Sequence, residues 1–149
     1  MKRHSERLRQ ALEQRAARVG VIGLGYVGLP LAVAFGKAGF SVLGVDVDRE
    51  RVARLNAGDS PVEDVGSDDL ATLVAARRLS ITTDAGALKD ADAIIICVPT
   101  PLGKSREPDI SHIVAAADAV AVVLRPGQLV VLESTTYPGT TEEVLLPRF

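Results

Sequence analysis

Residues 19–28 read V-G-V-I-G-L-G-Y-V-G, and this stretch decides the fold. Its first part is a short apolar run, typical of a strand buried on both faces: Val19, Val21 and Ile22. Three glycines follow in G-x-G-x-x-G spacing: Gly23, Gly25 and Gly28. An apolar segment of helical length, residues 29–35, comes next. A strand, a glycine turn and a helix in this order predict a site where a pyrophosphate lies on the N–H groups that open the helix.

The segment after this helix supplies the acid that a dinucleotide site needs. Residues 40–45 predict a second strand, and Asp46 follows it, 21 residues after Gly25. In dinucleotide-binding domains, a carboxylate at this separation along the sequence binds the adenosine ribose. It also repels a 2′-phosphate, so it favours NAD over NADP. The alternative is an ordinary glycine turn followed by a surface aspartate. The complete order of strand, turn, helix, strand and acid favours the cofactor site.

Composition sets limits on the class of protein. The 149 residues suffice for one domain with a core, and 47% hydrophobic with 24% charged residues is ordinary globular composition. The net charge of −2 gives no reason to expect nucleic acid or an anionic membrane as a partner. The single cysteine excludes an internal disulfide and a cysteine-based zinc site, and the two histidines suggest no metal cluster. With no apolar run of membrane-spanning length, we expect a cytoplasmic protein.

Two units are expected along the chain. Residues 1–18 form a charged lead-in with six basic and two acidic residues, in which Leu8 and Leu12 predict a short amphipathic helix. A mitochondrial transit peptide is the alternative, and the two glutamates oppose it. Residues 19–149 form the main domain.

Strands and helices alternate through this domain, which predicts an α/β fold with a Rossmann-type, doubly wound parallel sheet. Further strands are expected at residues 79–82, 92–98 and 129–132. One further helix is expected to start from Asp48 and another over residues 110–124. Two more helices are expected to begin at caps, one with Ser67 as its N-cap and one with a capping box at residues 140–143. Five strands are found where the full fold has six. The sequence is therefore expected to be truncated at its C-terminal end, with the fifth strand as an uncovered edge that promotes self-association.

In such sheets, ligands bind beyond the carboxyl ends of the strands. The segments that follow strands are therefore the candidates for the site: residues 23–28, Asp46, residues 98–102 and residues 133–135. Lys104 and Arg106, in the loop after the fourth strand, suit either contact with a diphosphate or simple solvation.

Several motifs occur together and in order: G-L-G-Y-V-G-L-P, V-D-V-D, C-V-P-T-P-L, R-E-P-D and E-S-T-T-Y-P-G-T-T-E-E. With these motifs the sequence resembles the N-terminal NAD-binding domain of the UDP-glucose/GDP-mannose dehydrogenase family. The last motif and P-L-x-K-x-R-E-P-D most resemble the UDP-N-acetylglucosamine 6-dehydrogenase branch. The resemblance covers nearly the whole chain.

The resemblance implies a set of site residues. It implies one catalytic residue, Thr135, which would help to hold an active-site water through its hydroxyl. Arg51 matches a basic position beside the adenosine ribose. The residues implied to bind the cofactor NAD are Gly23, Leu24, Gly25, Tyr26, Val27, Gly28, Asp46, Arg51, Val98, Pro99, Thr100, Pro101, Leu102, Ser134 and Thr135.

The family oxidises the C6 hydroxyl of a nucleotide sugar to a carboxylate with two NAD+ per turnover, so the resemblance implies a UDP-sugar substrate and at least a dimer. The family's catalytic cysteine, lysine and aspartate lie in a later substrate domain, so this chain alone is expected to be inactive. Cys97 lies in an apolar strand and is interpreted as a small buried hydrophobic residue. The alternatives are a non-catalytic NAD(H)-binding module, a truncated gene product, or a 2-hydroxyacid dehydrogenase that shares only the fold.

Overall fold

The computed structural model describes residues 2–149 and contains one sheet of five parallel strands in the order β3-β2-β1-β4-β5. This order confirms the predicted doubly wound topology. The strands are β1 (Arg18–Ile22), β2 (Ser41–Val45), β3 (Leu79–Thr82), β4 (Ala93–Ile96) and β5 (Leu129–Leu132). Predicted β3 and β5 have the observed bounds, whereas β4 is shorter than the predicted 92–98 because the backbone leaves the ladder near Cys97.

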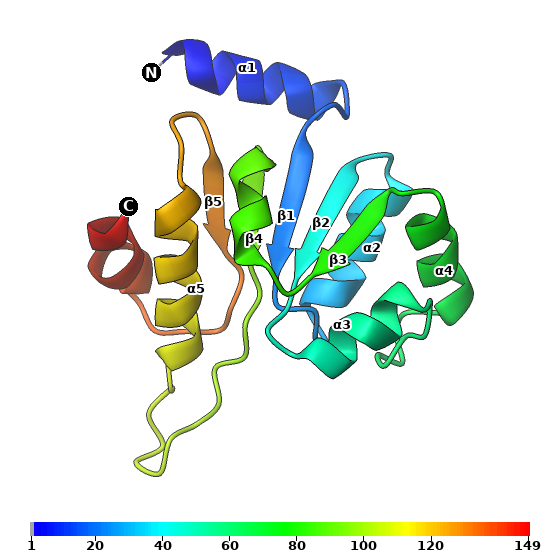
Figure 1. The fold of residues 1–149 in the computed structure, drawn as a ribbon. Coiled ribbons are helices and arrows are strands. Elements are labelled where there is room, and N and C mark those ends of the chain that lie inside the picture. The colour runs from blue at the N-terminus through cyan, green and yellow to red at the C-terminus, as the bar shows by residue number, and fades with distance from the viewer. Residues whose placement is uncertain (1) are drawn as a thin grey trace.

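Helices cover both faces of the sheet (Figure 1). One face packs against α2 (Gly28–Lys37), α3 (Arg49–Asn56) and α4 (Ser67–Ala75). The other face packs against η1 (Ala85–Asp90), α5 (Ser111–Val123) and the short helical turn η2 (Thr141–Leu145), while η3 (Leu146–Arg148) contacts α5.

Successive strand residues point to opposite faces, and this divides the core in two. On β4, Ile94 and Ile96 face α5, while Ile95 faces α2 together with Cys97, the residue after the strand. Ile94 and Ile96 are completely buried, and each such side chain stabilises the fold by about 1.5–3 kcal/mol. The fully apolar β4 is thus an interior strand, between β1 and β5, as its sequence predicts.

Two predicted helix caps are wrong. Helix α4 begins at Ser67 with Gly66 as its N-cap, and the Ser67 hydroxyl instead accepts a hydrogen bond from the Ser60 N–H at 3.0 Å, which braces the preceding loop. The capping box at 140–143 does not form, since the Thr140 hydroxyl donates to the Tyr137 carbonyl at 2.8 Å. Thr140 itself has helical dihedral angles, so its side chain is not placed over the following N–H groups.

The predicted lead-in helix is α1 (Lys2–Glu13), which lies beyond the amino ends of the strands, at the end of the molecule away from the strand-end loops (Figure 1). Arg15, in the link to β1, attaches this segment to the domain. Its guanidinium donates to the Ala38 carbonyl at 2.5 Å and lies 5.7 Å from the centre of the Phe40 ring. Because β1 begins at Arg18, the expected unit 1–18 includes the first strand residue, and the division into two units stays a prediction.

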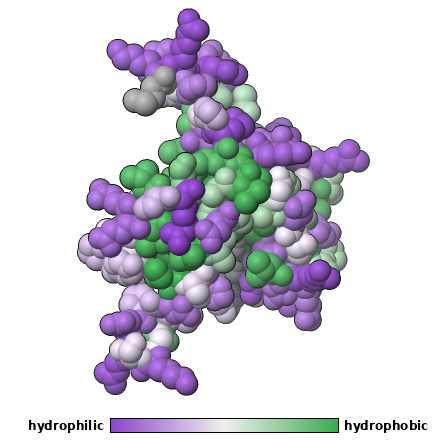
Figure 2. Space-filling model, turned by 60° about the vertical axis from the view of Figure 1, so that its left-hand side comes forward, coloured by the Kyte–Doolittle hydropathy of each residue, from purple (hydrophilic) through white to green (hydrophobic). Residues whose placement is uncertain are grey.

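Strand β5 is the outer strand next to β4, as expected from five strands. None of its residues is fully buried, and Leu129 is 43% exposed. Figure 2, which views the molecule from the side of β5 and α5, shows a broad apolar area on this surface. The self-association expected from this edge stays a prediction.

Candidate functional site

The strand register brings the predicted site segments to one edge of the sheet. Ile22 pairs with both Val45 and Ile96, and Ile96 pairs with Leu132, so four strands end at the same level. The segments that follow β1, β2, β4 and β5 consequently start side by side at the lower edge in Figure 1. This is the edge at which doubly wound sheets bind their ligands.

The three glycines of the turn after β1 differ in their surroundings. Gly23 has a φ of +90°, a conformation that side chains disfavour, and a Cβ there would lie 2.6 Å from the Cys97 carbonyl oxygen. A Cβ on Gly28 would lie 1.6 Å from the Gly23 carbonyl oxygen, so α2 and the turn touch through backbone. A Cβ on Gly25 would meet nothing within 4 Å. Two glycines thus close the turn, and the third faces open space, as a turn that admits a ligand to its backbone requires.

The N-terminus of α2 opens onto this space. Within residues 2–149, no side chain caps it, and its N-cap residue is Val27, which is 57% exposed. Tyr26, one residue earlier, is 82% exposed. At the start of α2, the Leu29 N–H donates to the Gly25 carbonyl at 3.1 Å and Pro30 has no N–H, so the N–H groups offered to an anion are those of the glycine turn and of Gly28, where the helix dipole favours a negative charge. The residues present therefore fit the pyrophosphate of a dinucleotide.

Asp46, the residue after β2, is joined to the glycine turn. Its side chain is 6% exposed, and Oδ2 accepts hydrogen bonds from the Leu24 N–H at 2.8 Å and from the Arg51 guanidinium at 3.2 Å. Oδ1 accepts from the Asp48 N–H at 2.9 Å. A buried carboxylate needs such donors, because an uncompensated charge is costly away from water. The predicted ribose acid therefore also fixes the turn that begins at Gly23.

These bonds to Asp46 were not predicted from the sequence. The V-D-V-D motif contains the signal for one of them, since an aspartate often accepts from the N–H two residues later. The bond from Leu24 joins residues 22 positions apart. Only the pairing of β1 with β2 brings these residues together.

The segment after β4 runs along the same edge and then projects from the domain as a hairpin (Figure 1). Val98 and Thr100 are half-buried, while Pro99, Pro101 and Leu102 are exposed. Leu102 is bridged to Pro108, and the Asp109 N–H donates to the Pro101 carbonyl at 2.8 Å. Lys104 and Arg106 lie at the exposed end of this hairpin.

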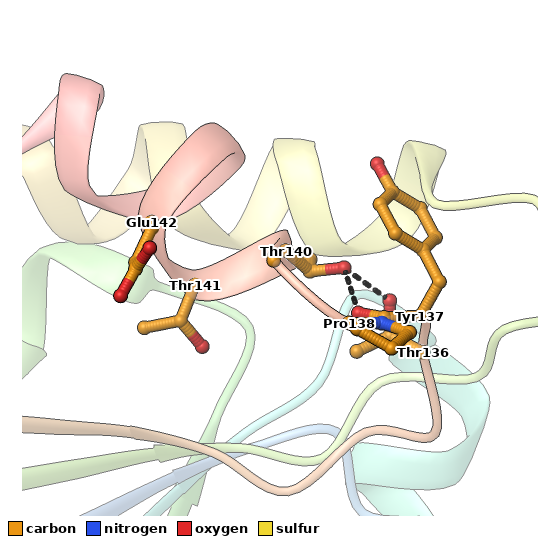
Figure 3. A pocket seen from close by; sticks show the side chains of 7 residues that line it. Thr136, Tyr137, Pro138, Thr140, Thr141 and Glu142 are labelled. Carbon is orange, nitrogen blue, oxygen red and sulfur yellow. Dashed lines mark hydrogen bonds between the residues drawn. The ribbon is translucent and has the colours of Figure 1, made fainter.

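The segment after β5 is tied to the segment after β4. The Ser134 hydroxyl donates to the Val98 carbonyl at 2.8 Å, a contact that the sequence did not reveal. Thr135, the next residue, is exposed. Just beyond it, residues 136–142 line a cavity of about 380 Å³, with the Thr140 hydroxyl 2.7 Å from that of Thr136 (Figure 3). None of the residues lining this cavity belongs to the glycine turn.

Cys97 lies beneath the site. Its side chain is buried against α2, and this burial, together with the charge of Glu133, raises the pKa of its thiol to about 11. A thiol with such a pKa stays protonated at neutral pH and is a poor nucleophile. This agrees with its interpretation as a small buried hydrophobic residue.

Within residues 2–149, no three His, Cys, Asp or Glu side chains are grouped so as to hold a metal ion. Across the same residues, every helix is too short or too polar to cross a membrane.

The fold and the site define a Rossmann-type domain of the dinucleotide-binding class. The evidence is the parallel sheet in the order β3-β2-β1-β4-β5, the glycine turn after β1 and the acid after β2. The sequence model of the UDP-glucose/GDP-mannose dehydrogenase family, NAD binding domain, matches residues 17–149. The chain therefore belongs to this family, and it is an NAD-binding domain, as its motifs predict.

Named relatives agree with this assignment. The chain is 42% identical over 130 residues to the UDP-N-acetyl-D-glucosamine 6-dehydrogenase of Pseudomonas aeruginosa, covering 87% of this chain and 30% of that protein. It is 43% identical over 129 residues to the UDP-N-acetyl-D-mannosamine dehydrogenase of Campylobacter jejuni, covering 85% and 31%. The chain thus spans about 30% of the length of these curated relatives.

Solved structures show the same fold. A ternary complex of GDP-mannose dehydrogenase from Pseudomonas aeruginosa superposes with a TM-score of 0.83 at 34% identity, covering 88% of this chain and 31% of that one. A UDP-glucose dehydrogenase from Pyrobaculum islandicum also gives a TM-score of 0.83, at 37% identity, covering 89% and 32%.

Proposed function

We propose that this chain is the cofactor-binding part of an NAD-dependent nucleotide-sugar 6-dehydrogenase whose substrate is a UDP-sugar, with UDP-N-acetylglucosamine as the first candidate. The observation that carries the cofactor half of the proposal is the bond between Asp46 Oδ2 and the Leu24 N–H at 2.8 Å, which joins the ribose acid to the glycine turn. Support for the substrate comes from relatives named as UDP-N-acetyl-D-glucosamine 6-dehydrogenases at 42% and 41% identity.

The proposed roles follow from the positions of the residues. Residues 23–28 hold the pyrophosphate through backbone N–H groups, and Asp46 binds the adenosine ribose with Arg51 beside it. Residues 98–102 and Ser134 line the path of the cofactor. Thr135, exposed at the end of β5, is the proposed holder of an active-site water. When bound, NAD+ supplies the hydride acceptor for oxidation of the sugar C6 alcohol, and the protein positions it.

Three further predictions belong to this proposal. The full enzyme is expected to be a cytoplasmic homo-oligomer. Residues 1–149 alone are expected not to oxidise a UDP-sugar, because Cys97 is the single cysteine and is buried. Production of NADH from NAD+ and UDP-N-acetylglucosamine by this chain would contradict that expectation.

Thermal unfolding with and without nucleotide tests cofactor binding. A ligand that binds only the folded state adds about 2.7 kcal/mol of stability at a hundredfold excess over its dissociation constant. We expect a clear rise in the unfolding temperature with NAD+ and a much smaller one with NADP+, which serves as the control. A cooperative transition that NAD+ leaves unchanged would refute the proposed cofactor site.

A further inference from the structure

A second cavity lies at the amino ends of the strands, between α1 and the turn that leads into β5 (Figure 1). It has a volume of about 210 Å³. One side of α1 and residues 125–127 form its walls, together with Asp92, the residue before β4. No residue that lines it belongs to the proposed cofactor site, which lies at the carboxyl ends of the strands.

The close approach of α1 to this turn depends on Gly127. Its φ is +90°, a conformation that side chains disfavour, and a Cβ there would lie 3.0 Å from Nδ1 of His4. No residue of α1 is fully buried, and Leu8 and Ala11, which also line the cavity, are half-buried. The helix therefore rests on the turn and leaves a space beside it, rather than packing into the core.

Arg125 forms a fixed wall of the cavity. Its Nε donates to the Lys89 carbonyl at 3.0 Å. Its Nη2 donates to the Ala91 carbonyl at 3.0 Å and to Asp92 Oδ1 at 3.1 Å. A guanidinium has five N–H donors, so the two on Nη1 stay without a partner among residues 2–149. Because the side chain is already held in place, a ligand that binds to it loses little free energy in ordering it.

Arg7 gives the cavity its excess positive charge. Arg125 compensates Asp92, whose other carboxylate oxygen accepts a hydrogen bond from the Arg18 N–H at 2.9 Å. Arg7 is exposed and forms no ion pair with an acid among residues 2–149. The charge left over in the cavity is therefore that of Arg7, and it favours an anion.

We propose that this cavity binds a phosphate group, carried by inorganic phosphate or by a small phosphate monoester, between Arg7 of α1 and Arg125 of the turn. The planar forks of two guanidinium groups match the oxygens of a phosphate, and the ring of His4 adds a further N–H donor. The bound phosphate links α1 to the domain. The inference is independent of the proposed function, because the cavity shares no residue with the cofactor site.

NMR spectra of the ¹⁵N-labelled 149-residue chain, titrated with sodium phosphate at constant ionic strength, test the proposal. We expect saturable shifts of the amide signals of α1, Gly127 and Gln128. Arg7→Gln should weaken phosphate binding at least about tenfold. Ala11→Leu, which keeps every charge and fills the cavity, should weaken it to a similar extent. A parallel titration with glycerol phosphate identifies the source of the phosphate group, since saturable binding of either probe supports the proposal and the tighter one indicates the source.

Arg9→Gln is the matched control, because it removes the same charge from the same helix at a residue that does not line the cavity. It should change the affinity by less than about twofold, since an exposed charge away from the site is screened by salt. Weakening by Arg9→Gln as large as by Arg7→Gln would overturn the proposal, because it would show diffuse attraction to a basic helix. Unchanged binding in Ala11→Leu would overturn it too.

The glycine turn also offers N–H groups to an anion, so the titration is repeated with saturating NAD+. Phosphate in the α1 cavity should bind as before. Shifts confined to residues 23–28 and abolished by NAD+ would overturn the proposal, since the phosphate would then occupy the pyrophosphate position. The absence of saturable shifts at α1 and Gly127 would overturn it as well, and neither result would affect the proposed cofactor site.

Discussion

Replacing Gly28 or Gly25 by alanine separates the packing of the glycine turn from its binding role. A Cβ on Gly28 would lie 1.6 Å from the Gly23 carbonyl oxygen, whereas real Cβ contacts essentially never fall below 3.0 Å. The clashing atom belongs to the backbone, and Gly23 is itself held in a positive φ conformation. The helix or the turn must therefore move as a unit.

The same change at Gly25 meets no atom within 4 Å. Overpacking typically lowers the free energy of unfolding by about 1–3 kcal/mol, and because the clash at Gly28 is with backbone, we expect Gly28→Ala to lower it by about 3 kcal/mol, the upper end of that range. Gly25→Ala should change the free energy of unfolding by less than about 1 kcal/mol. Its methyl group occupies the open space of the turn, so NAD+ binding should fall sharply even though the fold is kept.

Urea unfolding followed by circular dichroism measures the first effect, and the stabilisation of each variant by saturating NAD+ measures the second. The midpoints of two variants can be compared only if the free energy of unfolding falls with urea concentration at the same slope in both. If Gly28→Ala is as stable as the wild type, close backbone contact between α2 and the turn does not limit this position. If Gly25→Ala binds NAD+ with wild-type affinity, the open space at Gly25 is not the pyrophosphate position.

Three other predictions concern the neighbourhood of the site. Because the pKa of the Cys97 thiol is about 11, roughly a thousandth of it is thiolate at pH 8, so iodoacetamide should label the folded chain far more slowly than the urea-unfolded chain. Ser134→Ala, which removes the bond to the Val98 carbonyl, should lower the free energy of unfolding by about 1 kcal/mol, as urea midpoints would show, and no change would contradict that bond. The Ser111 N–H lowers the pKa of Asp109, so the stability contributed by Asp109 is present at neutral pH and is lost as the pH falls through the folded pKa. An acid unfolding curve that Asp109→Asn leaves unchanged would refute this contribution.

Much of the fold could be predicted because its signals are local. The apolar run of β4 indicates a strand inside the sheet, and the helix expected from Asp48 is α3, which begins one residue later with Asp48 as its N-cap. The two wrong caps, at Ser67 and Thr140, failed because each hydroxyl found another partner in the folded chain. A serine or threonine near a helix start indicates that a cap is available, while the loop that packs against it decides where the hydroxyl bonds.

The sequence by itself determined the class of fold, the glycine turn and the identity of the acid that follows β2, since each depends on spacing within a short stretch. Only the tertiary structure decided that Asp46 holds Leu24 and Arg51, that Ser134 holds Val98, and that Gly25 alone of the three glycines faces open space. These contacts join segments that are distant along the chain, and they exist because parallel strands in register end at one level. The register is a property of two paired strands together, so it cannot be read from any single stretch of sequence.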